Sequence, residues 1–368
     1  MARIRDWVAL GKSTVSSLSS DDMTNLYSLE WPETRKMLMA EHREAIEREP
    51  KAVRRWVRTV SAIFYGLATR LAPHRRILFA LSFFAFFLCL ASIFHEMYRP
   101  RYWVFVEITA TFLVMTLLLA MELIDKLKYR DELQLARDLQ ASLIPHQMPQ
   151  SERWDIAAFN RIANTVGGDI YDFVPLPDGR MAILFGDASG HGMAAGLVMA
   201  VAHAAFRTQL EVEPSPPSII ASLNRILCRT GGSRSFFSCC YVLLSPDGSY
   251  LATIAGHPPI LKIDAGGKII ERIGRGAYPL GVKAGLTWEI VSGSLVTGER
   301  LLLHSDGLTE ARNLGDHEFG DAYVEVVAGW HPELSASGLV ESLVSEWQLF
   351  MGGLPPEDDV SIAVVKRK

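Results

Sequence analysis

Two long apolar stretches stand out from the mixed polar and apolar pattern of the chain and predict membrane-spanning helices. The first runs from Ile77 to Phe94 without a charged residue, and the second runs from Tyr102 to Ile124 with one early charge at Glu107. Both lengths approach the roughly 20 apolar residues that a helix needs to cross a bilayer. The short link between them requires an antiparallel hairpin, which we place at residues 76–124. The same pattern would also suit two buried helices of a soluble protein.

Basic residues flank this hairpin unevenly. Arginines and lysines gather on both outer flanks, whereas the short link carries two: Arg54, Arg55, Arg58, Arg70, Arg75 and Arg76 before; Arg99 and Arg101 in the link; Lys126, Lys128 and Arg130 after. Because basic flanks stay on the cytoplasmic side, we expect two spans with both termini in the cytoplasm. No cleavable signal peptide is expected, since the first apolar stretch begins far from Met1. Residues 1–75 form a cytoplasmic helical segment in this scheme, whose basic half either lies on anionic lipid or is simply solvated.

A linker helix is predicted over residues 125–146. Apolar side chains recur on one stripe at spacings of three, three and four, and Pro145 ends the pattern; the stripe consists of Leu133, Ala136, Leu139 and Leu143. Such a stripe either pairs with a second copy of the chain or packs on the domain that follows. The pattern leaves both arrangements open. A homodimer formed through this helix is the expectation that we carry forward.

From residue 150 onwards, turn residues and apolar runs predict strands and hairpins. Two pairs of strands are each joined by Pro-Asp-Gly, in YDFVPLPDGRMAILFGD and CCYVLLSPDGSYLATIAGH, and a third hairpin turns at Ala-Gly-Gly. Further strands are expected in ERLLLHSDG and DDVSIAVVKRK, with helices near 193–211, 216–228 and 334–350. Buried hairpins with helices grouped between them favour one α+β domain of stacked antiparallel sheets at residues 150–368.

Charge and cysteine content narrow the function classes. The net charge of −4 gives no general basis for nucleic-acid binding. The four cysteines show neither the spacing of a zinc site nor that of a secreted disulfide framework. Cys228, Cys239 and Cys240 are therefore expected to be reduced thiols that fill the core of a cytosolic domain.

Five aspartates occupy the ends of the predicted strands, most of them beside glycine: Asp169, Asp187, Asp306, Asp358 and Asp359. Taken singly, each is more typical of a turn than of a catalytic site. Taken together, they predict a rim where carboxylates would repel one another unless cations neutralise them. Oxygen ligands without a nearby His or Cys cluster favour Mg²⁺ or Mn²⁺ over zinc.

Residues from about Leu133 to Lys368 resemble the SpoIIE-type, or RsbU-like, branch of the PP2C (PPM) family of metal-dependent serine/threonine phosphatases. The resemblance rests on several motifs in the family's order: ARDLQASLIP, VGGDIYDF, GDASGHGMAAGLVMA, IAGHPPIL, YPLGV, LLLHSDGLTEA and DDVSIAVV. One departure is Ile162, where the family often has proline. The resemblance implies a PP2C-like fold with stacked antiparallel sheets flanked by helices. The membrane hairpin lies outside the family core.

The resemblance also implies site roles. Asp187 would bridge two Mn²⁺ or Mg²⁺ ions with the Ala188 carbonyl as a further ligand, and the remaining aspartates would complete the site: Asp306 and Asp358 at the second metal, Asp169 at a metal or its water, and Asp359 as a substitute for Asp358. Two such ions activate water for attack on phosphorus and clamp the phosphoryl oxygens.

Three histidines and one arginine near these motifs are weaker candidates for a functional role than the aspartates. His191 is the candidate general acid for the leaving serine or threonine, with a role in the loop or at the helix start as the alternative. His257 is expected to brace a turn and His304 to pack within a strand. Arg161 could meet the substrate phosphate, although an exposed, idle side chain is the simpler interpretation.

These inferences lead to a membrane-anchored phosphoserine/phosphothreonine phosphatase in the cytoplasmic membrane of a bacterium. By the resemblance, its substrate would be a regulatory protein such as an anti-sigma-factor antagonist in a partner-switching system. A metal-dependent hydrolase of a small phosphorylated molecule would share every ligand. A non-catalytic signalling scaffold is the third alternative, and the complete set of aspartates argues against it.

Overall fold

The computed structural model describes residues 53–55, 58, 59, 61, 62, 65, 75, 77–82, 84, 86, 87 and 101–368, except 146, 164, 191, 231–234 and 275. The chain divides into two compact units, Met1–Leu127 and Lys128–Lys368. Half of the first predicted span and most of the N-terminal segment lie outside the described residues. The two-span hairpin and the orientation of the termini therefore stay predictions.

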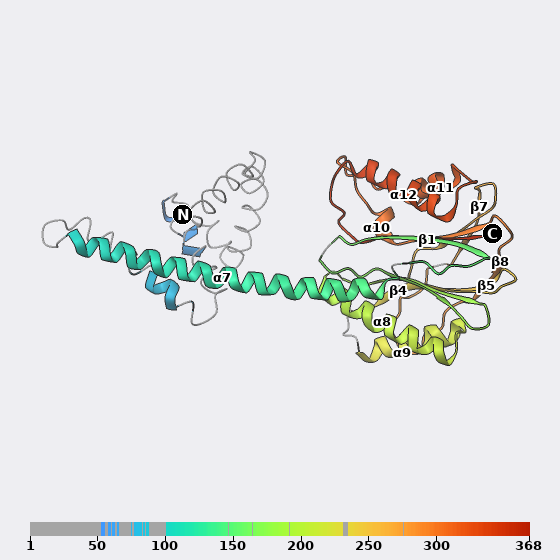
Figure 1. Cartoon of the computed structure of the whole chain (residues 1–368), viewed down its shortest axis with the longest axis horizontal. Coiled ribbons are helices and arrows are strands. Elements are labelled where there is room, and N and C mark those ends of the chain that lie inside the picture. The colour runs from blue at the N-terminus through green and yellow to red at the C-terminus, as the bar shows by residue number, and fades with distance from the viewer. Residues whose placement is uncertain are drawn as a thin grey trace, which may run out of the picture. The chain divides into compact units, whose positions relative to one another are not determined.

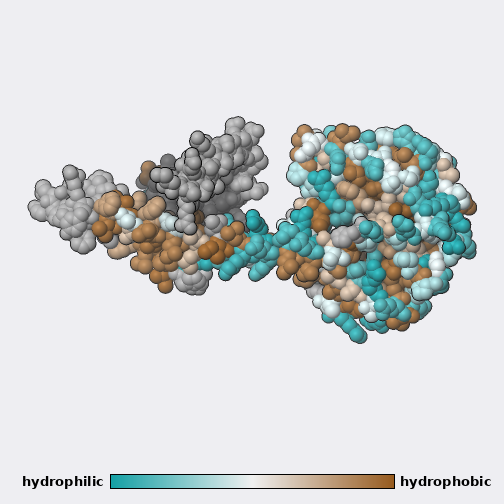
Figure 2. Space-filling model, viewed as in Figure 1, coloured by the Kyte–Doolittle hydropathy of each residue, from teal (hydrophilic) through white to brown (hydrophobic). Residues whose placement is uncertain are grey.

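The helix α7 (Arg101–Leu143) contains both the second predicted span and the predicted linker helix. Within the described residues, Ile108–Leu143 is one helix that could cross a membrane by length and composition, and its apolar window has no buried residue. Figure 2 shows apolar residues along the first part of α7 and hydrophilic residues along the part that follows. The helix ends two residues before Pro145, as the sequence predicts.

Two five-stranded antiparallel sheets form the C-terminal unit. The first has the order β1-β10-β9-β6-β7, and the second has the order β2-β3-β4-β5-β8. The strands of the first sheet are β1 (Trp154–Arg161), β6 (Ile260–Ile263), β7 (Ile269–Ile273), β9 (Arg300–His304) and β10 (Val360–Arg367). Those of the second are β2 (Ile170–Pro175), β3 (Met181–Ala188), β4 (Phe237–Leu244), β5 (Ser249–Ala255) and β8 (Val291–Ser294).

Helices cover the outer face of each sheet, so the unit has four layers (Figure 1). The helices α8 (Met193–Val212) and α9 (Pro216–Thr230) pack on the second sheet. The helices α11 (Asp321–Gly329) and α12 (Ala336–Met351) pack on the first, and the short α10 (Asp306–Thr309) precedes them in the chain. This arrangement confirms the PP2C-like fold of stacked antiparallel sheets flanked by helices.

Strand β3 shows why the apolar runs lack alternation. Ile183 and Phe185 point into the core between the sheets, whereas Ala182 and Leu184 point into the core beneath α8 and α9. Both faces of the strand are covered, so every position from Met181 to Phe185 is apolar and buried. The same double coverage buries Cys239 and Cys240 on β4 as core residues.

The predicted helices agree with α8, α9 and α12 to within a few residues. The sequence interpretation did not include β1, β8, α10 or α11. β1 pairs along its whole length with β10, and β8 closes the edge of the second sheet beside β5. Their stability comes from pairing with strands distant in the chain, which local patterns do not report.

Leu184→Ala should destabilise the C-terminal unit by about 2–5 kcal/mol, because it opens a cavity at a fully buried position. Leu251→Ala on β5 of the same sheet is the matched control, since Leu251 is 38% exposed. Thermal unfolding of the purified full chain in detergent measures both. Equal losses of stability in the two variants would contradict the assigned core.

Candidate metal centre

A glycine loop brings the start of β2 against the end of β3. An added Cβ at Gly168 would lie 2.7 Å from the Ala188 carbonyl oxygen and 2.7 Å from Oδ1 of Asp187. The Ala188 N–H donates to the Gly168 carbonyl oxygen at 3.2 Å. No side chain fits between these segments, which explains glycine at this position. The loop therefore places Asp169, the residue before β2, close to Asp187 and Ala188.

Asp169 is 2% exposed, and its Oδ2 has no hydrogen-bond partner. Burial raises its pKa well above the usual range, and the nearby Asp187 carboxylate raises it further. Hydrogen bonds from the side chains of Ser361 and Ser305 act in the opposite direction. A buried carboxylate oxygen without a donor is an unusual feature that a bound cation would satisfy.

The other sheet contributes its acids from β9 and β10. The N–H of Ser305, which follows β9, donates to the Ser361 carbonyl oxygen at 3.0 Å, so the end of β9 lies beside the start of β10. Asp306 is the first residue of α10. An added Cβ at Gly307 would lie 2.1 Å from the Asp359 carbonyl oxygen, so α10 begins directly on the Asp358–Asp359 segment.

The adjacent Asp358 and Asp359 have different surroundings. Asp359 is 5% exposed, and its carboxylate accepts hydrogen bonds from the N–H groups of Gly168 at 2.6 Å and Ala163 at 2.8 Å. Asp358 is exposed, and its Oδ1 accepts the Asp359 N–H at 2.8 Å. Asp359 thus holds the glycine loop, whereas the Asp358 carboxylate lies on the outer side of the rim.

Asp187 interacts electrostatically with every other predicted ligand carboxylate. Burial raises its pKa to about 8, and Asp306, Asp358 and Asp359 add to this effect in that order. The same Asp187 carboxylate raises the pKa of Asp169. Acidic groups from both sheets therefore converge at one rim.

The donor set fits a hard divalent cation, because it consists of carboxylates, a carbonyl group and hydroxyl groups. Across the described part of the chain, no group of three or more His, Cys, Asp or Glu side chains is already arranged around a metal position. Residues Asp169, Asp187, Ala188, Asp306 and Asp358 could hold such an ion.

The described histidines near the motifs, His257 and His304, are buried, and Arg161 contacts an aromatic ring. His191 lies outside the described residues. His257 is buried, its Nδ1 lies 3.0 Å from the Pro258 carbonyl oxygen, and burial lowers its pKa to about 4. Burial likewise lowers the pKa of His304, whose Nδ1 lies 3.2 Å from the Ser305 carbonyl oxygen. The Arg161 guanidinium stacks over the Trp347 ring at 5.4 Å from its centroid.

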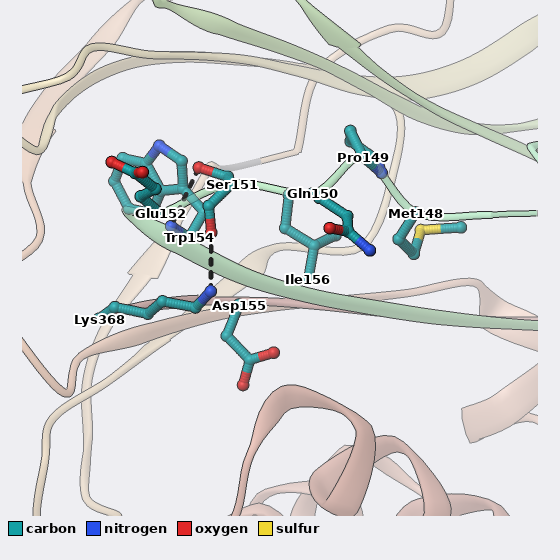
Figure 3. Close-up of a pocket in the computed structure, with 9 residues that line it drawn as sticks. All are labelled: Met148, Pro149, Gln150, Ser151, Glu152, Trp154, Asp155, Ile156 and Lys368. Atoms are coloured by element: carbon teal, nitrogen blue, oxygen red, sulfur yellow. Dashed lines mark hydrogen bonds between the residues drawn. The ribbon is translucent and has the colours of Figure 1, made fainter.

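Two hollows differ in their relation to this rim. One of about 290 Å³ is lined by Gly307, Glu310, Arg312 and Asp358, among others, and so adjoins the carboxylates. The larger, of about 450 Å³, is lined by residues 148–152, 154–156 and Lys368. Figure 3 shows Lys368 crossing it to donate to the Ser151 carbonyl oxygen at 2.7 Å. This hollow lies at the far end of β10 from Asp358 and has no evident part in the chemistry.

Several supporting residues escaped the sequence interpretation. Asp172 is fully buried on β2 and accepts hydrogen bonds from Arg207 at 2.6 and 2.8 Å, with His203 Nε2 at 2.8 Å. This cluster attaches α8 to the second sheet. Asn224 on α9 accepts from the Gly281 N–H at 2.8 Å, which fixes the YPLGV segment. The sequence feature that could have identified them is a polar residue among apolar neighbours, as Asp172 is in VGGDIYDF.

Without metal, the free energy of unfolding should fall as pH rises from about 4 to about 8. Asp187 has a pKa of about 8 in the folded chain, against an ordinary value of 3.8, so the folded chain binds more protons in this window. Asp187→Asn should flatten the decline. Thermal unfolding in EDTA at pH 5 and pH 8 measures it, with the exposed Asp131→Asn as control. Identical pH slopes in wild type and Asp187→Asn would contradict the assignment.

The C-terminal part of the chain is similar in sequence to known proteins. The family described as "Stage II sporulation protein E (SpoIIE)" matches residues 177–368. Phosphoserine phosphatase RsbU of Bacillus subtilis (strain 168) is 25% identical over 241 residues, which cover 65% of this chain and 71% of RsbU. Phosphoserine phosphatase RsbP of the same strain is 23% identical over 228 residues, which cover 61% of this chain and 54% of RsbP.

Solved structures agree on the fold. The SiaA-PP2C domain of Pseudomonas aeruginosa has a TM-score of 0.58 at 20% identity and covers 66% of this chain and 98% of its own. The PP2C phosphatase domain of SpoIIE from Bacillus subtilis, with a fragment of its regulatory domain, has a TM-score of 0.51 at 21% identity and covers 59% and 64%. The chain therefore belongs to the SpoIIE family, as an RsbU-like member of the PP2C-type serine/threonine phosphatases.

Proposed function

We propose that the chain is a membrane-anchored, metal-dependent phosphoserine/phosphothreonine protein phosphatase. The observation that carries this proposal is the convergence of acidic strand ends from both sheets at one rim, where burial and mutual repulsion raise the pKa of Asp169 and Asp187. Such a rim is suited to divalent cations, and the family supplies the reaction class. Two Mn²⁺ or Mg²⁺ ions bound there would activate water and neutralise charge on the phosphoryl group.

The chain's own residues have separable parts in this proposal. Asp187 is the bridging ligand, which is supported by its electrostatic coupling to the acids of both sheets. Asp358 is favoured over Asp359 as a ligand, because both Asp359 oxygens already accept backbone N–H groups. The absence of a side chain at Gly168 leaves the Ala188 carbonyl group accessible to the site. His191 is the proposed proton donor to the leaving serine or threonine oxygen.

The proposed substrate is a phosphorylated regulatory protein, such as an anti-sigma-factor antagonist in a partner-switching system. Two relatives named phosphoserine phosphatase, RsbU and RsbP, support a phosphoprotein substrate. The chain spans about half the length of RsbP, so substrate and partners are inferred for the shared domain.

The membrane anchor and the homodimer complete the proposal. The apolar, exposed surface of α7 supports contact with lipid, and the predicted hairpin would place the phosphatase domain at the cytoplasmic face. Further along the helix, Leu135 and Leu139 are 61% and 62% exposed, one helical turn apart. They offer a face through which two copies of the linker helix could pair, while Leu143 packs on the phosphatase domain.

Asp187→Ala should abolish metal-dependent phosphate release from a phosphoserine peptide by the full chain in detergent. Asp178→Ala is the matched control, since Asp178 lies in the turn that leads into β3 and should leave turnover intact. Wild type would be measured with Mn²⁺ and with EDTA. Turnover with bound metal in Asp187→Ala would refute the assignment.

The same assay separates the alternatives. Preference for a small phosphoester over phosphoprotein would favour the small-molecule hydrolase. Bound metal without wild-type turnover would point to an enzyme held inactive until its linker or a partner releases it. Neither metal binding nor turnover would indicate a scaffold.

A glycine-rich insertion after Gln134 should change phosphatase activity in membranes by about 5-fold or more, the size of a typical coupling between two sites. The insertion interrupts α7 between the predicted span Tyr102–Ile124 and the phosphatase domain. Activity of wild type and variant would be compared in vesicles and in detergent. An unchanged rate in vesicles would rule out coupling through the helix.

A further inference from the structure

Gln140 is a polar residue at the buried position of the linker helix. It lies three residues before the end of α7 and is 4% exposed, whereas the neighbouring Leu139 is 62% exposed. Near the helix end, the face that packs on the phosphatase domain therefore includes Gln140 and excludes Leu139, one member of the apolar stripe. A buried glutamine requires partners for both its carbonyl oxygen and its amide group.

Both partners belong to one residue. The Gln140 Nε2 donates to the Gly167 carbonyl oxygen at 2.7 Å, and the Gly167 N–H donates to Gln140 Oε1 at 2.9 Å. The side-chain amide thus pairs with Gly167 as one strand residue pairs with another. Both backbone groups of this glycine depend on the linker helix for their hydrogen bonds.

Gly167 belongs to the loop that shapes the carboxylate rim. The next residue, Gly168, donates its N–H to Asp359, and its carbonyl oxygen accepts the N–H of Ala188. Asp169 follows directly. Three segments hold this loop: the linker helix through Gln140, the start of β10 through Asp359 and the end of β3 through Ala188. The segments at β10 and β3 carry proposed metal ligands, whereas the linker helix carries none.

We propose that Gln140 is a positioning residue that sets the geometry of the metal centre through the Gly167–Gly168 loop. Loss of its amide would leave two buried backbone groups without partners, and the loop would have to move or admit water to satisfy them. Such a movement changes the separation of Asp169 from Asp187, and with it the affinity for the cations. The proposal rests on the proposed function and names the contact by which the linker helix acts on the site.

Gln140→Met tests this inference, because methionine keeps the length of the side chain and removes both hydrogen bonds. Gln134→Met is the matched control, since Gln134 lies on the exposed face of the same helix and hydrogen-bonds only within it, to Asp138. Mn²⁺ binding to the purified full chain in detergent would be measured by calorimetry, together with phosphate release as a function of Mn²⁺ concentration and thermal unfolding in EDTA.

We expect Gln140→Met to weaken Mn²⁺ binding by about 10- to 100-fold, the usual effect of losing a residue that orients metal ligands. The Mn²⁺ concentration for half-maximal turnover should rise in parallel, while the KM for the phosphopeptide changes little. Mn²⁺ affinity equal to that of Gln134→Met would overturn the proposal.

A second measurement covers a failure of Gln140→Met to fold. Hydrogen exchange of the wild-type full chain with and without Mn²⁺ should show the end of α7 and the Gly167–Gly168 loop gaining protection together. Protection of the loop alone would overturn the proposal. Mn²⁺ binding without turnover in wild type would point to an enzyme held inactive, and it would leave the Gln140 test intact because Mn²⁺ affinity is measured directly. No Mn²⁺ binding in wild type would overturn both.

Discussion

Repulsion between carboxylates is the constraint on which the rest of this structure depends. Two sheets pack face to face, and their strand ends bring acidic residues to the same rim. Burial makes ionisation of Asp169 and Asp187 costly, and neighbouring carboxylates make the ionisation of both groups more costly still. Divalent cations would neutralise such an arrangement. The property that weakens the metal-free fold would then be the one that suits the proposed site to metal.

The surroundings of the rim hold the backbone without adding side chains to the centre. Gly167, Gly168 and Gly307 lie where an added Cβ would meet neighbouring atoms at less than 3.0 Å. Hydrogen bonds hold the backbone here instead of side-chain packing. Asp359 accepts two backbone N–H groups from the segment between β1 and β2, and Ser305 Oγ accepts the Ser361 N–H at 2.9 Å. These bonds fix the segments that carry the proposed metal ligands.

Buried polar clusters attach the helical layer to the second sheet. Asp172 is fully buried with Arg207 and His203, and Asn224 holds Gly281. A buried carboxylate is tolerable only when it is paired and hydrogen-bonded, so these contacts specify where α8 and α9 lie on the sheet. The Gln140 amide does the same for the last turns of α7. Specific polar contacts thus fix the positions of α8, α9 and the end of α7 in the C-terminal unit.

The sequence alone determined those features that depend on neighbouring residues. The apolar runs of β3 and β4 are uninterrupted because both faces are covered, the two Pro-Asp-Gly turns place Gly179 and Gly248 at positive φ, and α7 ends before Pro145. The positions of the aspartates at strand ends were also predicted from their neighbours in the sequence. Family motifs added the fold.

Only the tertiary structure decided which residues meet. The N–H of Gly168 bonds Asp359 across 191 positions of sequence, and this contact distinguishes Asp359 from the adjacent Asp358. The burial of Gln140, in place of Leu139 on the predicted stripe, depends equally on a loop 27 positions away. Periodicity reports which face of an element is apolar. It carries no information about the partner of a buried polar group, because that partner is chosen by the packing of distant segments.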